Sequence, residues 1–275
     1  MMGKSSSGAR VRRQALADAL DAELMKRLLP ATAVHALGDW LAGSGARYAI
    51  GAGAHAVEYV PAHWSGVEPW PGQLFERSHA EVARVTRDQV AAVAREAVEG
   101  CRWSEALVAS YVWGQGRTGY GPHRLMGILA EPGVADALAE CGSVLRKEGA
   151  VAAYRVLYGS VRGLGPAFFT KLLYFLDQAM DVPPTPRALV LDQRVACVFR
   201  THAARVGLES GLASASDVAT WIWSDGGWTP HRYGVYLKWM NAASGQLASS
   251  GIGWPEASPD LLELALFDGV WDPAT

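Results

Sequence analysis

Gly163, Leu164 and Gly165 form a Gly-Leu-Gly stretch that Pro166 follows directly, between two apolar segments with helical periodicity. Proline suits the first position of a helix because the amide that it lacks would have no partner there. Glycine can adopt backbone angles that are closed to other residues, and it leaves room for a ligand. We therefore expect a tight turn between two helices, with outward-facing N–H groups at the start of the second helix that could bind an anion.

A plain connection between two helices, in which a glycine ends the first helix, would show the same turn. The turn by itself therefore leaves both interpretations open. The ionisable residues that follow it carry the argument further.

A lysine interrupts the apolar segment after the turn. Lys171 lies about one helical turn beyond Ala167, so the two residues share a face of the expected helix. The segment from Phe168 to Leu176 is otherwise almost entirely apolar. A lysine in such a segment either extends its amine to the surface or lies in a dry pocket, where the neutral amine is a usable nucleophile. Both interpretations fit the sequence.

Asp192 follows a loop that contains three prolines and lies near the start of another helical segment. A carboxylate at a helix N-terminus caps the first turn. It also stays ionised there, which suits the stabilisation of a developing positive charge. Capping and catalysis do not exclude each other, so Asp192 could do either or both.

The chain has 275 residues, half of them hydrophobic, which is enough for one large domain or two small ones. The periodicity predicts a mainly α fold with a small β element near the N-terminus, in the pieces 48–50 and 57–60. We expect a flexible tail (1–9), an N-terminal helical and irregular region (10–99) and a helical region (100–275). The helices expected from the pattern are 11–29, 32–41, 88–98, 104–113, 122–129, 133–141, 147–159, 166–179, 188–206, 216–224, 229–243 and 259–267.

The formal net charge of −2 argues against a protein that coats nucleic acid by bulk charge, but not against one that holds a few phosphates locally. The three cysteines lie far apart, so a zinc or iron–sulfur site built on cysteine is not expected, nor is another metal or cofactor. The sequence has no apolar run long enough to span a membrane, and acidic residues interrupt its N-terminal segment as no signal peptide would. We expect a cytoplasmic protein.

The turn, the helix after it and the segment Leu191-Asp192-Gln193-Arg194-Val195 together resemble the helix-hairpin-helix DNA glycosylases, which carry a Gly/Pro-rich loop and a catalytic aspartate. Within that superfamily the chain is most similar to the 8-oxoguanine DNA glycosylase branch, which pairs a lysine with the aspartate. The resemblance covers about residues 100–245. It implies a helix-hairpin-helix glycosylase-like fold, a monomer, and double-stranded DNA with a damaged or modified base as the partner of a nucleoid-associated enzyme.

The resemblance also implies roles for individual residues. Gly163 and Gly165 would bind a DNA phosphate through backbone N–H groups, and Gln115 would fill the gap left by the extruded base. Lys171 would attack the sugar C1′ and form a Schiff base, which adds AP-lyase activity. Asp192 would stabilise the oxocarbenium-like sugar and help to activate the nucleophile.

Further residues could contact the nucleic acid. Arg117, near Gln115, could hold a phosphate, although an arginine there is equally consistent with a solvated face. The flipped base needs an aromatic or apolar slot. Phe168, Trp223 and Tyr236 are candidates for it, and each of them could also be a core residue.

The chain departs from the family pattern in two places. In the lysine-bearing members the lysine follows two residues after the second glycine, where this chain has Ala167; Lys171 comes six residues after Gly165. The stretch between Gln115 and the turn is also short, so the helices between them must be trimmed.

Three functions remain open on the sequence. The first is a base-excising glycosylase with AP-lyase activity, with 8-oxoguanine as the expected base. Its variant is a glycosylase that acts on modified bases of foreign (phage) DNA. The others are a non-catalytic helix-hairpin-helix DNA-binding protein, in which Asp192 only caps a helix, and an unrelated α-helical enzyme or interaction protein.

Overall fold

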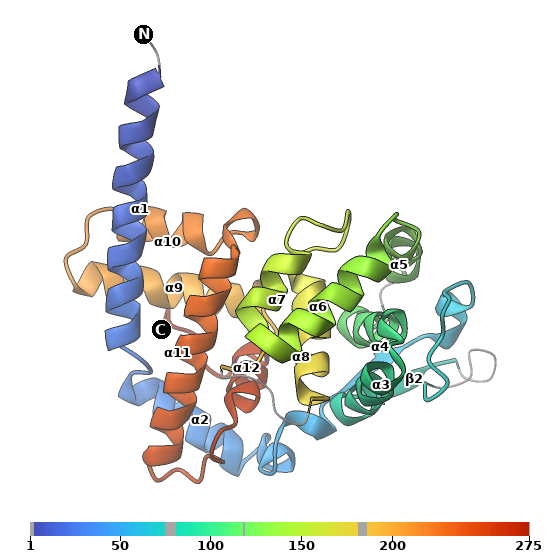
Figure 1. The fold of residues 1–275 in the computed structure, drawn as a ribbon. Coiled ribbons are helices and arrows are strands. Elements are labelled where there is room, and N and C mark those ends of the chain that lie inside the picture. The colour runs from blue at the N-terminus through green and yellow to red at the C-terminus, as the bar shows by residue number, and fades with distance from the viewer. Residues whose placement is uncertain (1–2, 75–80, 118, 181–185, 275) are drawn as a thin grey trace. The chain divides into compact units, whose positions relative to one another are not determined.

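The computed structural model describes residues 3–74, 81–117, 119–180 and 186–274. The chain forms two compact units: unit 1 comprises residues 1–49 and 193–275, and unit 2 comprises residues 50–192. The described residues contain twelve α-helices and one two-stranded sheet, which confirms the expected mainly α fold with a small β element (Figure 1). No helix in this part of the chain is long and apolar enough to cross a membrane.

Unit 2 has a short sheet followed by six α-helices in its described part. The elements are β1 (Ala56–Tyr59), β2 (Ala83–Thr86), α3 (Arg87–Gly100), α4 (Trp103–Gln115), α5 (Gly121–Leu129), α6 (Val134–Glu148), α7 (Ala150–Leu157) and α8 (Pro166–Gln178). The strands are antiparallel, with Val57 opposite Val85. Thr86 ends β2 and begins α3 through a capping box: its hydroxyl accepts the Gln89 amide, and the Gln89 side chain accepts the Thr86 amide.

Helices α4 and α8 form the centre of unit 2. Every residue of α4 from Ala106 to Trp113 is buried, and so is every residue of α8 from Phe169 to Asp177. The two helices pack on each other, and α3 packs on both. Helices that are apolar on all sides are expected in the interior of a protein. Lys171 and Asp177 are therefore exceptions in a dry environment.

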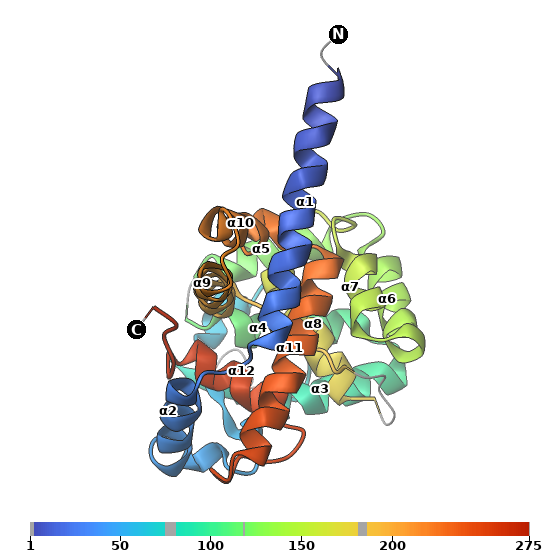
Figure 2. The same ribbon diagram turned by 90° about the vertical axis from the view of Figure 1, so that its left-hand side faces the viewer.

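Unit 1 is helical throughout its described elements, which are α1 (Gly3–Lys26), α2 (Ala31–Ala42), α9 (Gln193–Glu209), α10 (Ala215–Ile222), α11 (Pro230–Ser249) and α12 (Pro259–Phe267). Helix α1 lies beside α9, α10 and α11, as the turned view shows (Figure 2). The core is aromatic: the Phe199 ring lies 4.9 Å from the Trp223 ring, 5.2 Å from Tyr236 and 4.8 Å from Trp239, between centroids.

The division into units differs from the expected one. Helix α3 packs on α4 and α8 and lies with them in unit 2. Unit 1 instead takes in both ends of the chain. Residues 3–9, expected in a flexible tail, are the first turns of α1.

Several element boundaries also differ. Helix α6 runs to Glu148 and α7 begins at Ala150, because Gly149 between them has φ +87° and cannot continue a helix. The expected strand 48–50 is a 3-10 turn at Ala46–Tyr48, whereas the expected piece 57–60 corresponds to β1. Residues 188–191 are buried but not helical, so α9 begins later than expected, directly after Asp192.

Candidate active site

The turn between α7 and α8 has the expected form. Gly163 has φ +83°, which favours glycine, and a Cβ there would lie 3.4 Å from the Ile128 side chain of α5. Leu164 is 3 % exposed and packs inward. Gly165 precedes Pro166 in an extended conformation, and a Cβ there would meet nothing within 4 Å. The turn is therefore open on the side of Gly165, at the N-terminus of α8.

Lys171 lies in the interior of unit 2 rather than at its surface, since only 7 % of it is exposed. Its amine donates a hydrogen bond to the carbonyl of Ala167, one turn back along α8. Nζ lies 5.4 Å from the centre of the Phe168 ring. Helical side chains point toward the N-terminus of their helix. The amine therefore lies beside Ala167, the position at which the lysine-bearing glycosylases carry their lysine.

A glycine on α4 makes room for the stem of Lys171. A Cβ on Gly114 would lie 2.4 Å from Cδ and 2.8 Å from Cε of Lys171, closer than real contacts allow. The stem of the lysine thus occupies the space of an absent side chain. Nothing local in the sequence marks this contact, because it joins residues 57 positions apart.

Thr170 connects α8 to the residue before Asp192. Its hydroxyl accepts the amide of Leu191 at 3.2 Å, and the same oxygen lies 3.3 Å from the Leu191 carbonyl and 2.8 Å from the Pro166 carbonyl. Thr170 is completely buried and adjoins Lys171, whereas Leu191 adjoins Asp192. Consecutive Cα atoms are about 3.8 Å apart, so this contact brings the backbones of the two candidate catalytic residues together.

A second contact fixes the other end of the same segment. Asp177, 1 % exposed, accepts the Ala188 amide at 2.8 Å and pairs with Arg187 at 3.2 Å. Burial raises the pKa of the Asp177 carboxyl, and the Ala188 amide and Arg187 oppose the rise. Because Asp177 meets residue 188 and Thr170 meets residue 191, the segment runs antiparallel to α8. It leads Asp192 toward the N-terminal half of that helix.

Phe168 is the candidate base-pocket residue that lies beside Lys171. It is half-buried, and its ring stacks on Tyr111 with 4.1 Å between centroids and 11° between planes. The guanidinium of Arg124 lies 6.0 Å from the same ring. Burial raises the pKa of Tyr111 to about 12, and the charge of Arg124 opposes the rise. The aromatic pair is thus flanked by the Arg124 guanidinium and the Lys171 amine.

Gln115 and Arg117 lie where α4 ends. Gln115 is the last residue of the helix, directly after the glycine that contacts Lys171. Its Cγ lies 2.1 Å from where a Cβ on Gly121 would be, so the side chain packs on the start of α5. Arg117 is exposed and pairs with Glu58 at 3.7 Å.

A family model described as "Putative 8-oxoguanine DNA glycosylase OGG-like protein" matches residues 50–267, well over half of the chain. The chain belongs to this family. The match includes the turn, Lys171 and Asp192, and it leaves the N-terminal 49 residues outside. No curated protein and no solved structure matches the chain.

The other two aromatic candidates lie in unit 1 of this OGG-like glycosylase. Trp223 is 2 % exposed and Tyr236 is fully buried, and both pack against Phe199. This packing favours a core role for Tyr236. Trp223 lines a pocket of about 370 Å³ at the start of α9, with Arg194, Arg200 and other residues.

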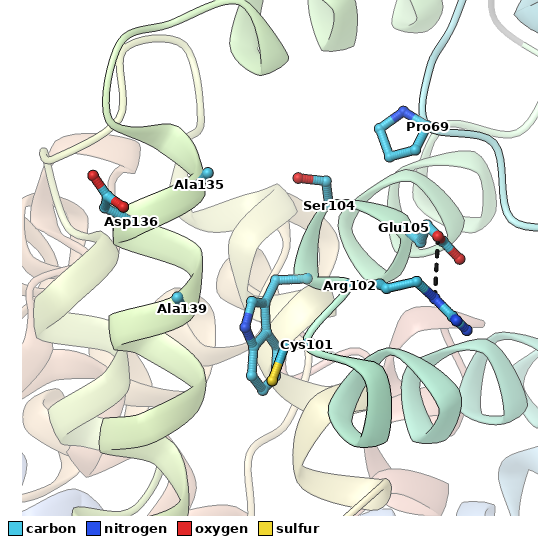
Figure 3. A pocket seen from close by; sticks show the side chains of 9 residues that line it. Pro69, Cys101, Arg102, Ser104, Glu105, Ala135, Asp136 and Ala139 are labelled. Carbon is cyan, nitrogen blue, oxygen red and sulfur yellow. Dashed lines mark ion pairs between the residues drawn. The ribbon is translucent and has the colours of Figure 1, made fainter.

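A larger pocket, of about 560 Å³, lies in unit 2 between the start of α4 and helix α6 (Figure 3). Ser104 of α4 lies opposite Ala135 of α6, whereas Glu105 points away from α6 and pairs with Arg102 at 3.2 Å. None of the candidate catalytic residues lines it. The candidate site, at Lys171 and Asp192, is therefore separate from this pocket.

Proposed function

We propose that this OGG-like glycosylase excises 8-oxoguanine from double-stranded DNA and then cleaves the strand as an AP lyase. Lys171 is the nucleophile and Asp192 the electrostatic and basic residue. The observation that carries the proposal is the contact of Thr170 with Leu191. It brings the segment that leads to Asp192 against the helix that carries Lys171. The enzyme acts as a monomer on nucleoid DNA in the cytoplasm.

The proposed chemistry begins at the sugar. The neutral amine of Lys171 attacks C1′ while the bond from C1′ to the base breaks, and the base leaves with the bonding electrons and takes up a proton. Asp192 stabilises the positive charge that develops on the sugar and accepts a proton from the attacking nitrogen. Opening of the sugar ring gives a protonated Schiff base on Lys171. Loss of a C2′ proton then expels the 3′ phosphate.

The burial of Lys171 supports this assignment. An ammonium group costs free energy to bury, whereas a neutral amine is suited to a dry site and to attack on carbon. The hydrogen bond to Ala167 holds the nitrogen near the turn. Gly163 and Gly165 of that turn would hold a phosphate close to the reacting sugar.

The base must leave the duplex before the sugar is accessible, and extrusion costs a few kcal/mol. Phe168 offers a partly exposed ring that stacks on Tyr111. We assign the flipped base to this ring. Gln115 would fill the gap in the duplex, and Arg117 would exchange Glu58 for a phosphate.

Borohydride trapping tests the proposal, because it reduces the Schiff base to a permanent adduct. The protein should be trapped on duplexes that carry 8-oxoguanine or an abasic site. Lys171→Gln should abolish trapping while DNA binding persists, and the exposed Lys147→Gln should trap like the wild type. Persistent trapping by the Lys171 variant would refute the lysine assignment, and base release by Asp192→Asn at the wild-type rate would refute the role of Asp192.

The same assay separates the two alternative functions. A non-catalytic DNA-binding protein would bind each duplex without base release or trapping. A glycosylase directed at foreign DNA would release modified bases of phage type and leave 8-oxoguanine in place. A panel of lesions and modified bases, assayed for base release in a single turnover, therefore decides the substrate.

A further inference from the structure

The first part of α1 is strongly basic. Lys4, Arg10, Arg12 and Arg13 occur before the first acidic residue, Asp18, in a chain whose formal net charge is −2. We call residues 3–13 the arm. The arm lies outside residues 50–267, which match the glycosylase family. The family match therefore says nothing of its role.

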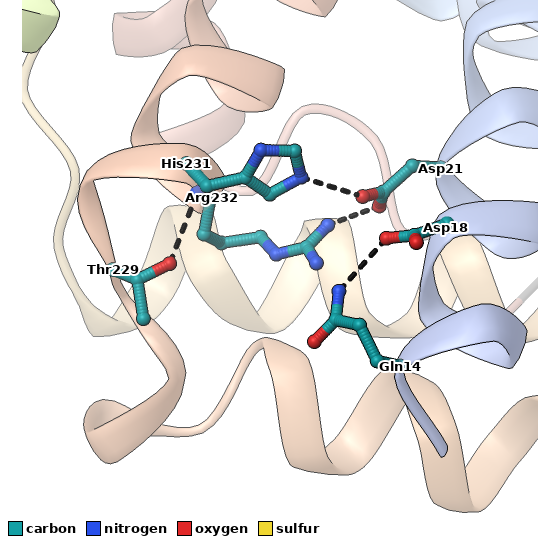
Figure 4. Close-up of polar contacts among 6 residues, drawn as sticks. All are labelled: Gln14, Asp18, Asp21, Thr229, His231 and Arg232. Atoms are coloured by element: carbon teal, nitrogen blue, oxygen red, sulfur yellow. Dashed lines mark hydrogen bonds and ion pairs between the residues drawn. The ribbon is translucent and has the colours of Figure 1, made fainter. Parts of the chain in front are cut away.

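The second half of α1 is firmly attached to unit 1. Ala17, Leu20 and Leu24 are at most 1 % exposed. Asp21 forms an ion pair with Arg232, which is 3 % exposed, at the start of α11 (Figure 4). Asp21, Asp18 and His231 could together hold a metal ion, but this pairing of Asp21 explains the cluster as a structural ion pair.

The arm itself leaves the body of unit 1. Residues 10–15 are all exposed, Val11 by 66 %, and Figures 1 and 2 both show α1 continuing beyond the helices beside it. Arg13 contacts the ring of Trp221 at 4.2 Å and marks the base of the arm. Within the described part of the chain, Arg10 and Arg12 make no ion pair. An eleven-residue helix is about 16 Å long, so the backbone of the arm extends well beyond the residues that pack on unit 1.

A helical segment with so little apolar surface to bury gains little stability of its own. Exposed arginines in that position can bind a polyanion, whose negative groups would form ion pairs with Arg10 and Arg12. Val11 is the one large apolar residue of the arm, too little for insertion into a membrane surface. Duplex DNA, the polymer on which the family acts, fits the charge and needs no apolar contact.

We propose that the arm binds the phosphate backbone of duplex DNA outside the lesion, without regard to base sequence. The inference rests on the proposed function, which supplies the DNA. Each phosphate that a cation neutralises releases counterions, so the logarithm of the affinity falls with the logarithm of salt concentration by about 0.9 per contact. The arm should therefore add to the salt dependence of binding and leave the chemistry unchanged.

The test is the affinity of the full chain for an undamaged duplex, titrated over a range of salt concentrations. The double variant Arg10→Gln/Arg12→Gln should lower the magnitude of the slope by roughly 1.8. Arg84→Gln/Arg95→Gln removes the same charge from exposed positions of unit 2 and should keep the wild-type slope. An unchanged slope in the arm variant overturns the proposal, as does an equal loss in the control.

Two further measurements distinguish this inference from the proposed function. Base release in a single turnover at saturating enzyme should be the same for the wild type and the arm variant. Failure of base release in both, with the slope still reduced by the arm variant, would refute the function and keep the arm. Sedimentation with vesicles of anionic phospholipid that depends on Arg10 and Arg12, with an unchanged DNA slope, would assign the arm to membranes and overturn the proposal.

Discussion

Replacing Gly114 with alanine should inactivate Lys171 although the lysine itself is unchanged. The added methyl group would lie 2.4 Å from Cδ of the lysine, whereas ordinary contacts begin at 3.4 Å. The stem must therefore move by about 1 Å, and the amine moves with it. A displacement of 1 Å can cost about 100-fold in rate, because reaction requires the nucleophile in a near-attack position. We expect base release and borohydride trapping to slow by about that factor.

The fold should survive this substitution. Overpacking costs about 1–3 kcal/mol, and the better helix propensity of alanine returns about 1 kcal/mol. Gly127→Ala is the matched control, since it adds the same methyl group to α5, where nothing lies within 4 Å. That control should keep wild-type activity. Base release by Gly114→Ala within threefold of the wild-type rate, with unfolding in urea unchanged, would refute the reasoning that places the amine here.

Two further predictions concern the buried polar contacts. Thr170→Val keeps the shape of the side chain but leaves the Leu191 amide without its partner. The free energy of unfolding in urea should fall by about 1–3 kcal/mol, and base release should slow because Asp192 is misplaced. Thr170→Ser, which keeps the hydroxyl, should retain wild-type stability and base release. Burial lowers the pKa of His202 from 6.5 to about 4, so the unfolded chain binds the extra proton between those values. The contribution of the neutral His202 to the free energy of unfolding should be fully present above pH 6.5 and be lost, by about 3 kcal/mol, as the pH drops to 4. Urea titrations at several pH values should show this loss in the wild type and not in His202→Gln. An equal loss in the variant would contradict the assignment.

Much of the helical framework was predictable because its signals are local. The proline at the start of α8 and the apolar pattern of α12 gave boundaries that agree with the structure to within one residue. The helix predicted to begin at residue 188 was wrong over residues 188–191, because the contacts that decide their conformation are not local. The apolar run of this segment is indistinguishable from a buried helix, but the side chains of Thr170 and Asp177, far away in sequence, bind its backbone and hold it extended.

The candidate site divides in the same way. Lys171 could be selected from the sequence because an amine is unusual in an apolar segment, and Asp192 because a carboxylate directly before a helix can both cap the helix and stay ionised for catalysis. Gly114 could not, because the space that it leaves matters only to a side chain on another helix. Thr170 could not either, since a hydroxyl in a helix gives no sign of a partner beyond its own turn.

Unit 1 is made from both ends of the chain, and this has a consequence for how the protein is synthesised. Helix α1 leaves the ribosome before unit 2 does, yet α9, α10 and α11, on which it packs, come only after residues 50–192. At about 5–20 residues per second the delay is roughly 7–30 s. During that time the apolar stripe of Ala17, Leu20 and Leu24 has no native cover, whereas unit 2 is already complete. We therefore expect the yield of folded protein to depend on the pace of translation and on chaperones that shield nascent helices.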